Sequence, residues 1–388
     1  MKKIFLCLIS ICFVLTGCSF GKKSEKTVLN EFQDKVNKSD SYYLSGSMEL
    51  VNNEDVYTYD ISVSYKKDDF YKIELVNVIN NHRQIILRNE EGVYIVTPSL
   101  NKSFKFQSDW PYNNSQVYLL SSLLDDIMND EERKFETTDS GYVFTSMVNY
   151  PNNEKLVSQK VYFDKDYLPT GVEVIDSDGN IQIKMDFDKI DLKTEFNDTY
   201  FDLNSVLDTE SIDDGNGSSN NSSSSNNDRT SNDNVNSNSN NNSNTNTNNS
   251  DVNNETQETG NNDQNSDGER TKETATIDDI IYPMYLPVNT YLTGQERVAT
   301  EDGERLILTF TGDSSFTLVE ETVSYSNRPE IIPTYGDVEL IGSSLAVIND
   351  NSANWFDNGI EYYIVSDVMS TNELLDVVRS ISVLPVSK

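Results

Sequence analysis

The sequence predicts an α+β protein with two folded parts. The first is expected to be a curved antiparallel half-barrel sheet with one or two covering helices, and the second a smaller α+β domain. Apolar and polar residues alternate with period two over much of residues 57–188, which is typical of half-buried strands. Only two segments have helical spacing in the first part of the chain, one before this region and one within it. A sheet of many antiparallel strands twists, and its apolar face must be covered.

One helix is expected before the strands and one among them. Val28, Leu29, Phe32 and Val36 form a single apolar stripe, and Ser24 is a suitable N-cap. The second helix is expected over residues 115–128. We expect its apolar face to close a cleft on the sheet as a lid, formed by Val117, Leu120, Leu124 and Ile127.

The strands are expected where period-two segments are separated by turns rich in Asn, Asp, Gly and Pro. These segments are 57–65, 70–75, 84–89, 92–97, 103–107, 134–138, 142–150, 157–164, 171–176 and 180–188. Their order along the chain predicts a meander.

The N-terminus has the pattern of an export signal. Lys2 and Lys3 precede a dozen mostly apolar residues, which are too few to cross about 30 Å of hydrocarbon as a permanent helix. The residues Leu-Thr-Gly-Cys that end at Cys18 resemble a bacterial lipobox. This resemblance implies that residues 1–17 are a signal peptide and that Cys18 is diacylated, which would anchor the chain stably to the outer face of the cytoplasmic membrane. Residues 18–26 would then form the lipidated N-terminus and tether.

A linker is expected to separate the two folded parts. Residues 213–276 contain no aromatic residue and are dominated by Asn and Ser, so they cannot offset the entropy of ordering. We therefore expect a first domain over 27–203, a disordered linker over 204–276 and a C-terminal domain over 277–388. In the last domain, strands are expected over 297–299, 305–311, 316–322, 338–341, 344–347, 354–357 and 360–366, followed by a helix over 371–380. Trp355 is expected to pack under that helix.

The order of elements in the first part resembles the LolA-like fold. The segments that carry the resemblance are the hairpin around RNEEGVYIVTPSLNKSFKF, the inserted helix after Asp109-Trp110-Pro111, and Leu168-Pro169-Thr170-Gly171 before a long strand. This group includes lipoprotein carriers, RseB-type regulators of sigma factors, and sporulation and germination lipoproteins of Firmicutes. The second part resembles a domain found at the C-terminus of LolA-like lipoproteins and on some anti-sigma factors. One implication of the resemblance is that the concave face of the sheet holds an acyl chain. The alternative is that side chains of the protein itself fill this face.

Composition excludes several kinds of chemistry. The formal net charge of -34 disfavours binding to nucleic acid. His82 is the only histidine, and no cysteine would keep a free thiol after processing, so sites that need two imidazoles or thiolate ligands cannot be built. We expect no catalytic residues, no metal and no cofactor, and hence no enzyme.

The function expected is that of a non-catalytic, membrane-anchored adaptor for a cell-envelope protein. The resemblance implies a sporulation or germination role, with a cell-wall amidase as one partner. Two alternatives stay open, a lipid- or lipoprotein-binding chaperone and an envelope-stress sensor that regulates an anti-sigma factor. Acidic residues outnumber basic ones, by 18 to 5 over residues 277–388. This excess of negative charge predicts a basic partner.

Overall fold

The computed structural model describes residues 23–52, 55–107, 110, 114–207, 275–301 and 303–381. Cys18, the predicted signal peptide and most of the predicted linker lie outside these residues. The described residues before and after the linker belong to one compact unit. In this described part of the chain, no helix is long and apolar enough to cross a membrane.

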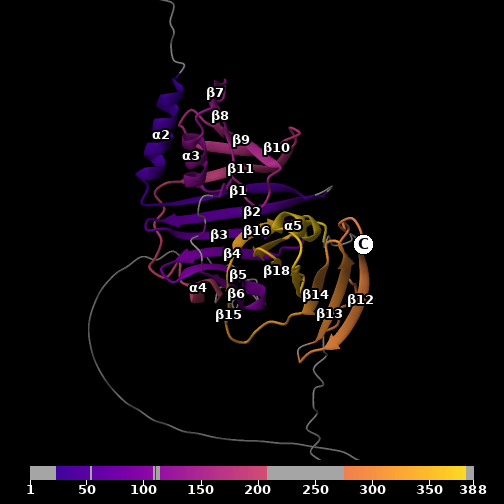
Figure 1. Cartoon of the computed structure of the whole chain (residues 1–388). Helices are drawn as coiled ribbons and strands as arrows, with labels where there is room; N and C mark the ends of the chain where they lie inside the picture. The colour runs from indigo at the N-terminus through magenta and orange to yellow at the C-terminus, as the bar shows by residue number, and fades with distance from the viewer. Residues whose placement is uncertain are drawn as a thin grey trace, which may run out of the picture. The chain divides into compact units, whose positions relative to one another are not determined.

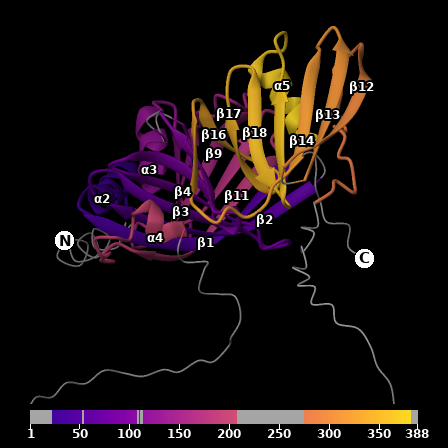
Figure 2. The same cartoon turned by 90° about the horizontal axis from the view of Figure 1, so that it is seen from below.

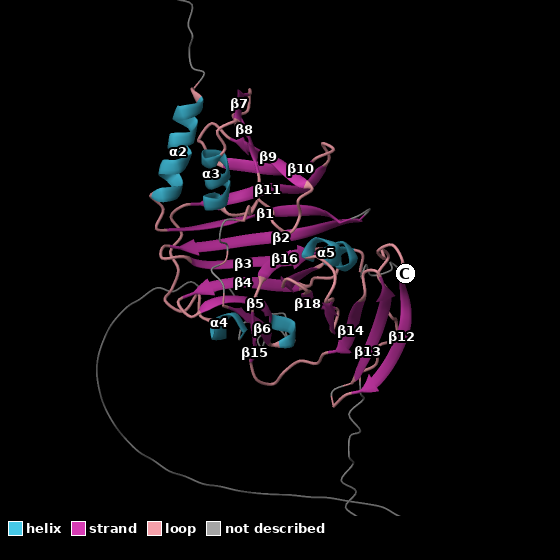
Figure 3. Cartoon of the chain, in the orientation of Figure 1, coloured by secondary structure: helices cyan, strands magenta, loops and turns pink. Residues whose placement is uncertain are grey.

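The first sheet is open and curved (Figures 1 and 3), and it is built from two antiparallel meanders that join side by side, not from the single meander expected. It has twelve strands in the order β15-β6-β5-β4-β3-β2-β1-β11-β10-β9-β8-β7. Eleven come from the first part of the chain, and these are β1 (Ser41–Asn52), β2 (Asp55–Lys66), β3 (Phe70–Asn77), β4 (Arg83–Asn89), β5 (Gly92–Thr97), β6 (Lys102–Phe106), β7 (Lys134–Thr137), β8 (Tyr142–Met147), β9 (Leu156–Phe163), β10 (Pro169–Asp176) and β11 (Ile181–Asp191). The predicted fold class is therefore confirmed.

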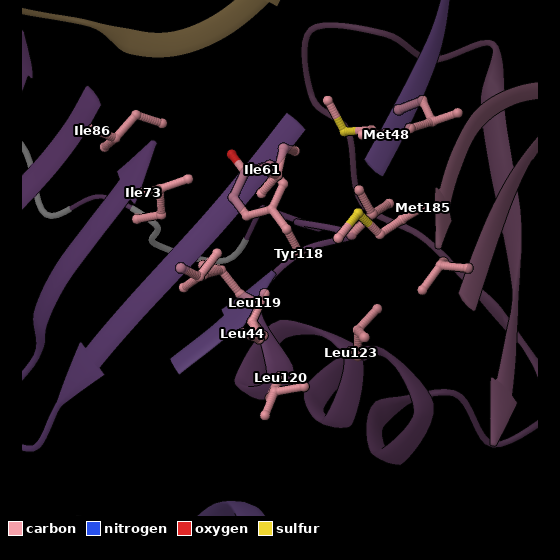
Figure 4. Packing of buried hydrophobic residues seen from close by; sticks show 14 of the residues in the cluster. Leu44, Met48, Ile61, Ile73, Ile86, Tyr118, Leu119, Leu120, Leu123 and Met185 are labelled. Carbon is pink, nitrogen blue, oxygen red and sulfur yellow. The ribbon is translucent and has the colours of Figure 1, made fainter. Parts of the chain in front are cut away.

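Two helices cover one face of this sheet. Helix α2 (Glu25–Asn37) begins after Ser24, whose side chain accepts a hydrogen bond from the backbone of Thr27. Helix α3 (Leu120–Asn129) lies below the strands, and Figure 4 shows Leu120 and Leu123 near Leu44 of β1. All three side chains belong to the main hydrophobic core. Burial of this face is the main stabilising contribution expected for the sheet.

Helix α3 begins five residues later than the sequence predicts. The backbone N–H of Ser115 donates to the carbonyl of Asn149 at 2.9 Å, and the side chain of Ser115 accepts from the N–H of Asn149 at 2.7 Å. Because these bonds tie Ser115 to the chain after β8, the first residues of the predicted helix form a turn instead.

The opposite face of the sheet has a smaller apolar cluster. Helix α4 (Leu203–Leu207) places Leu203, Val206 and Leu207 against Ile85 and other residues of β4 and β5. The described structure thus continues past residue 203, where the sequence predicts the linker to begin.

The second sheet has seven antiparallel strands in the order β12-β13-β14-β19-β18-β17-β16. Their bounds are β12 (Thr290–Ala299), β13 (Glu304–Gly312), β14 (Phe316–Thr322), β16 (Asp337–Ile341), β17 (Ser344–Ile348), β18 (Ser352–Asp357) and β19 (Ile360–Val365). Helix α5 (Thr371–Arg379) begins with a capping box formed by Ser370 and Glu373. Trp355 is buried in the same cluster as the apolar residues of α5, as expected, and stacks on Tyr362.

One strand links the two sheets. Strand β15 (Glu330–Thr334) comes from the second part of the chain and pairs in parallel with β6 of the first sheet. This strand was not expected from the sequence, because five residues that include Pro333 give no clear alternation. Lys102 and Glu330 form an ion pair of 2.9 Å across the junction.

Candidate functional site

The concave face of the first sheet is where the LolA-like resemblance places a ligand cleft. In this chain, side chains from the second sheet pack there. Leu345 and Val347 of β17 and Phe356 of β18 belong to the same buried core as the strands β1–β6. Phe356 stacks on Phe104 of β6 with ring centroids 5.0 Å apart. The apolar face is therefore occupied largely by the chain itself.

Polar contacts fix the second sheet in this position. The phenol of Tyr59 in β2 donates to the carbonyl of Gly342, and the N–H of Leu345 donates to Oε1 of Gln84 at 2.5 Å. At the end of α5, the guanidinium of Arg379 donates to Oε1 of Glu339 at 3.0 Å and to the carbonyl of Asn152 at 2.8 Å. These contacts satisfy polar groups at a junction that is otherwise apolar.

A small cavity remains beside this junction. Its volume is about 120 Å³, and its walls include Met48, Val117, Tyr118, Leu345 and Arg379. A cavity of about 150 Å³ holds a single benzene ring. The space is therefore too small for an acyl chain in this conformation.

The four predicted lid residues lie close together but have different surroundings. Val117 precedes α3 and lines the cavity. Leu120, Leu124 and Ile127 lie on α3 and are buried in the main core. The position of Cys18 lies outside the described residues.

The second sheet has an exposed apolar surface at its outer edge. We define the β12 patch as the exposed apolar residues at the start of strand β12 and in the segment before it, and its members are Tyr282, Met284, Tyr285, Leu286, Val288, Tyr291 and Leu292. Met284 is 84% exposed, Val288 82% and Tyr291 63%. Contiguous exposed apolar patches mark interaction sites on monomeric proteins more often than scattered single residues do.

Strand β12 is also an edge strand, as Figures 1 and 2 show. Among the described residues it pairs with β13 alone, so the N–H and C=O groups of its other edge have no strand partner. An unprotected edge can accept an added strand from another chain. Only residues 297–299 were expected to form a strand here, because a strand exposed on both faces has no alternation of apolar and polar residues.

The electrostatic character of the β12 patch is acidic. Asp279, Glu296 and Asp313 lie on β12, on the segment before it or on the adjoining turn. None of the three makes an ion pair within the described part of the chain. Arg297 is already paired with Glu304 at 2.6 Å. The edge therefore favours a cationic partner.

Several buried acids have shifted pKa values. Burial raises the pKa of Asp126 to about 6, of Asp357 to about 6 and of Glu320 to about 7. Burial lowers the pKa of His82 to about 4, so this imidazole is neutral at pH 7. Asp126 accepts hydrogen bonds from Ser115 and Gln159, which gives it a structural role.

No arrangement typical of nucleophilic or metal-assisted catalysis is found among the described residues. They contain no group of three or more His, Cys, Asp or Glu side chains suited to a metal ion. The loop of Asp176 is a hairpin turn, in which the Asp176 carboxylate accepts hydrogen bonds from the backbone N–H groups of Asp178 and Asn180.

Comparison with known proteins gives a family match and one relative along the full length. A family model described as "Sporulation protein YdcC-like" matches residues 1–201. The sporulation protein YdcC of Bacillus subtilis (strain 168) is 28% identical over 380 residues, which cover 98% of this chain and 96% of the relative.

Solved structures with lower similarity were also found. The MucA/MucB complex of Pseudomonas aeruginosa contains a chain with 10% identity and a TM-score of 0.30, and the match covers 93% of this chain and 99% of that one. The complex of the CwlD amidase with the GerS lipoprotein from Clostridioides difficile gives 16% identity and a TM-score of 0.20, over 46% of this chain and 100% of that one. At these TM-scores the likenesses carry no inference about what this chain binds.

Proposed function

Since the chain belongs to the family of YdcC-like sporulation proteins, we propose that it is a membrane-anchored, non-catalytic lipoprotein that binds a protein partner at the cell envelope during sporulation. The anchor is proposed to be a diacylglycerol on Cys18, on the outer face of the cytoplasmic membrane. The observation that supports the binding role is the β12 patch, where exposed aromatic and aliphatic side chains lie on or before a strand that has no partner on one edge among the described residues.

The partner is proposed to present an extended, basic segment. A strand added to β12 would satisfy its free backbone groups, and alternate side chains would contact Tyr291 and its neighbours. Asp279, Glu296 and Asp313 would attract Lys or Arg residues of that segment. The region 277–388, with a formal net charge of -13, would add long-range attraction.

Lipid carriage is the less supported alternative. An acyl chain on the concave face would have to displace Leu345, Val347 and Phe356 from the main core. The cavity of about 120 Å³ cannot take it without that displacement. Mass spectrometry of lipids that co-purify non-covalently with the Cys18→Ser chain distinguishes the two functions, since a stoichiometric acyl ligand in the absence of the anchor would support the carrier.

A cell-wall amidase and an anti-sigma factor are the two partners to test first. Both come from the resemblance to LolA-like lipoproteins. The chemistry of the β12 patch requires only that the partner expose a basic segment on the outer side of the membrane.

Site-specific photo-crosslinking in sporulating cells tests the docking surface. A crosslinker at Tyr291 is expected to capture one envelope protein with a basic extracytoplasmic segment, whereas a crosslinker at Val157 of β9 is not. Met284→Ser should reduce the Tyr291 crosslink by removing exposed apolar surface. Met147→Ser is the matched control, because Met147 is 64% exposed on a different sheet. Equal capture at Tyr291 and Val157, or equal effects of the two serine variants, would refute the proposal.

The anchor is tested separately by fractionation. Cys18→Ser is expected to move the chain from the membrane pellet to the soluble fraction and to abolish labelling by a lipid precursor. A variant that stays in the membrane fraction without label would show that another attachment operates.

A further inference from the structure

The free edge of β12 is not uniform along its length. Apolar side chains lie at its start, where Tyr291 is 63% exposed. The N–H of Thr290 donates to the carbonyl of Pro287 at 3.2 Å, which holds the exposed Val288 beside the same end. The β12 patch is thus concentrated at the start of the strand.

The second half of the strand has negative charge without a partner. Glu296 is exposed on the strand, and Glu301 is exposed in the turn that follows it. Neither forms an ion pair within the described part of the chain. The one cation in this half of β12, Arg297, is already paired with Glu304 at 2.6 Å. The edge is therefore apolar at one end and acidic at the other.

The register with β13 fixes the face on which Glu296 lies. Residues directly opposite each other on paired strands lie on the same face of a sheet. Leu306 and Leu308 of β13 are buried in the core, whereas Ile307 between them is opposite Glu296. Glu296 therefore lies on the face that points away from that core. Arg305, on the same face, is already paired with an acid of β14 at 2.6 Å.

A bulge separates the two halves of β12. Leu292 and Gly294 are opposite consecutive residues of β13, so Thr293 is the extra residue. From Gly294 to the end of the strand the register with β13 has no further shift. Because a bulge bends its strand and increases the twist, an added strand can pair regularly with residues 294–299 but not across the bulge.

The backbone of this regular half is available for pairing. Residues 294–299 pair with β13 alone, and their backbone makes no hydrogen bond to another described segment. Antiparallel pairing is slightly more stable per residue than parallel pairing. An added strand is therefore expected to run antiparallel to β12.

From this arrangement, and resting on the function proposed above, we propose that the partner segment pairs antiparallel with residues 294–299 and places a Lys or Arg opposite Glu296. Aromatic or aliphatic side chains follow roughly four or five positions later in the partner, where they contact Tyr291 and Val288. The basic residue thus precedes the apolar residues in the partner's sequence, whereas a parallel strand requires the reverse order. This arrangement matches charge to charge and apolar surface to apolar surface along one edge.

A second copy of this chain fits the edge less well. Its own β12 contains no Lys, and its Arg297 is already paired. Each copy would also bring a formal net charge of -13 over residues 277–388, so the two edges would repel each other.

The test uses the full chain with Cys18→Ser and two labelled peptides of identical composition. The first peptide has a single Lys in its N-terminal half and Tyr and Val in its C-terminal half, and the second has the reversed sequence. Fluorescence anisotropy measures their affinities. The first peptide is expected to bind at least about ten-fold more tightly than the second.

An exchange of charges tests the contact with Glu296. Glu296→Lys should weaken binding of the first peptide by about five- to ten-fold, and replacement of the peptide lysine by Glu should restore it. Glu49→Lys on β1 is the matched control, because it makes the same change of net charge at an exposed residue of the first sheet. This control should leave the affinity nearly unchanged.

The inference is overturned if the reversed peptide binds as tightly as the first, if the two Lys variants have equal effects, or if neither peptide binds. A dimer of the chain that pairs through β12 would also overturn it. These outcomes are distinct from failure of the proposed function. Capture of an envelope protein at Tyr291, with no preference between the peptides, would refute the direction and register alone.

Discussion

Replacement of Phe356 by Ala tests whether the second sheet is an integral part of the main core. Phe356 is 1% exposed and stacks on Phe104 of β6, with centroids 5.0 Å apart and the ring planes 14° from parallel. Truncation of a buried Phe to Ala costs about 3–5 kcal/mol, which includes the cavity left behind and the lost ring contact. We expect a loss near 4 kcal/mol in the free energy of unfolding. With a urea dependence of about 3 kcal/mol per molar, the midpoint should fall by roughly 1 M.

The chain has two tryptophans that report on different clusters. Trp110 belongs to the main core of the first sheet, and Trp355 belongs to the core under α5. Urea unfolding is followed by fluorescence in two single-tryptophan backgrounds, Trp110→Phe and Trp355→Phe. Because Phe356 contacts the first sheet directly, Phe356→Ala should lower the midpoints of both probes together.

A matched substitution shows whether the effect is transmitted through the junction. Phe316 stacks on Phe310 within the second cluster, with centroids 4.3 Å apart. Phe316→Ala should therefore lower the Trp355 midpoint by more than the Trp110 midpoint. If Phe356→Ala leaves the Trp110 transition unchanged, the two sheets unfold independently and the packing argument is wrong.

Three further outcomes are expected. Arg379→Ala removes the partner of the half-buried Glu339 and should cost about 1–3 kcal/mol, measured by urea unfolding, with a smaller loss for Arg379→Lys, which keeps the charge. Gly46→Ala would place a Cβ atom 2.1 Å from the backbone oxygen of Asp186 at the β1–β11 bulge. The free energy of unfolding is therefore expected to fall by about 2–3 kcal/mol, and an unchanged melting temperature would contradict this. Burial raises the pKa of Glu320 to about 7 from an ordinary 4.5, so the unfolded state loses its proton first and stability should fall as pH rises from about 4.5 to 7. Glu320→Gln should remove this slope and stabilise the protein above pH 7 by up to about 3 kcal/mol, whereas an identical pH profile in the variant would show that other acids cause it.

Local signals in the sequence predicted most of the secondary structure. Ser24 with the stripe from Val28 predicted α2, and Ser370 with Glu373 predicted the start of α5. Strands with one buried face alternate clearly, and most of them, such as β2, were found, but β1 alternates in the same way and was not predicted. Strand β12 was predicted poorly because it is exposed on both faces, so its apolar and polar residues do not alternate. The start of α3 was predicted poorly because the hydrogen bonds of Ser115 hold the first residues of the apolar stripe outside the helix.

The sequence by itself determined the class of the fold, the exclusion of two-histidine chemistry, and the family. Period-two alternation and composition are properties of neighbouring residues, so they can be read without a structure. Only the tertiary structure decided that Leu345, Val347 and Phe356 fill the concave face and that β15 joins the first sheet. Each of these features joins residues more than two hundred positions apart. Their contact depends on how the two sheets pack, and no local pattern records that packing.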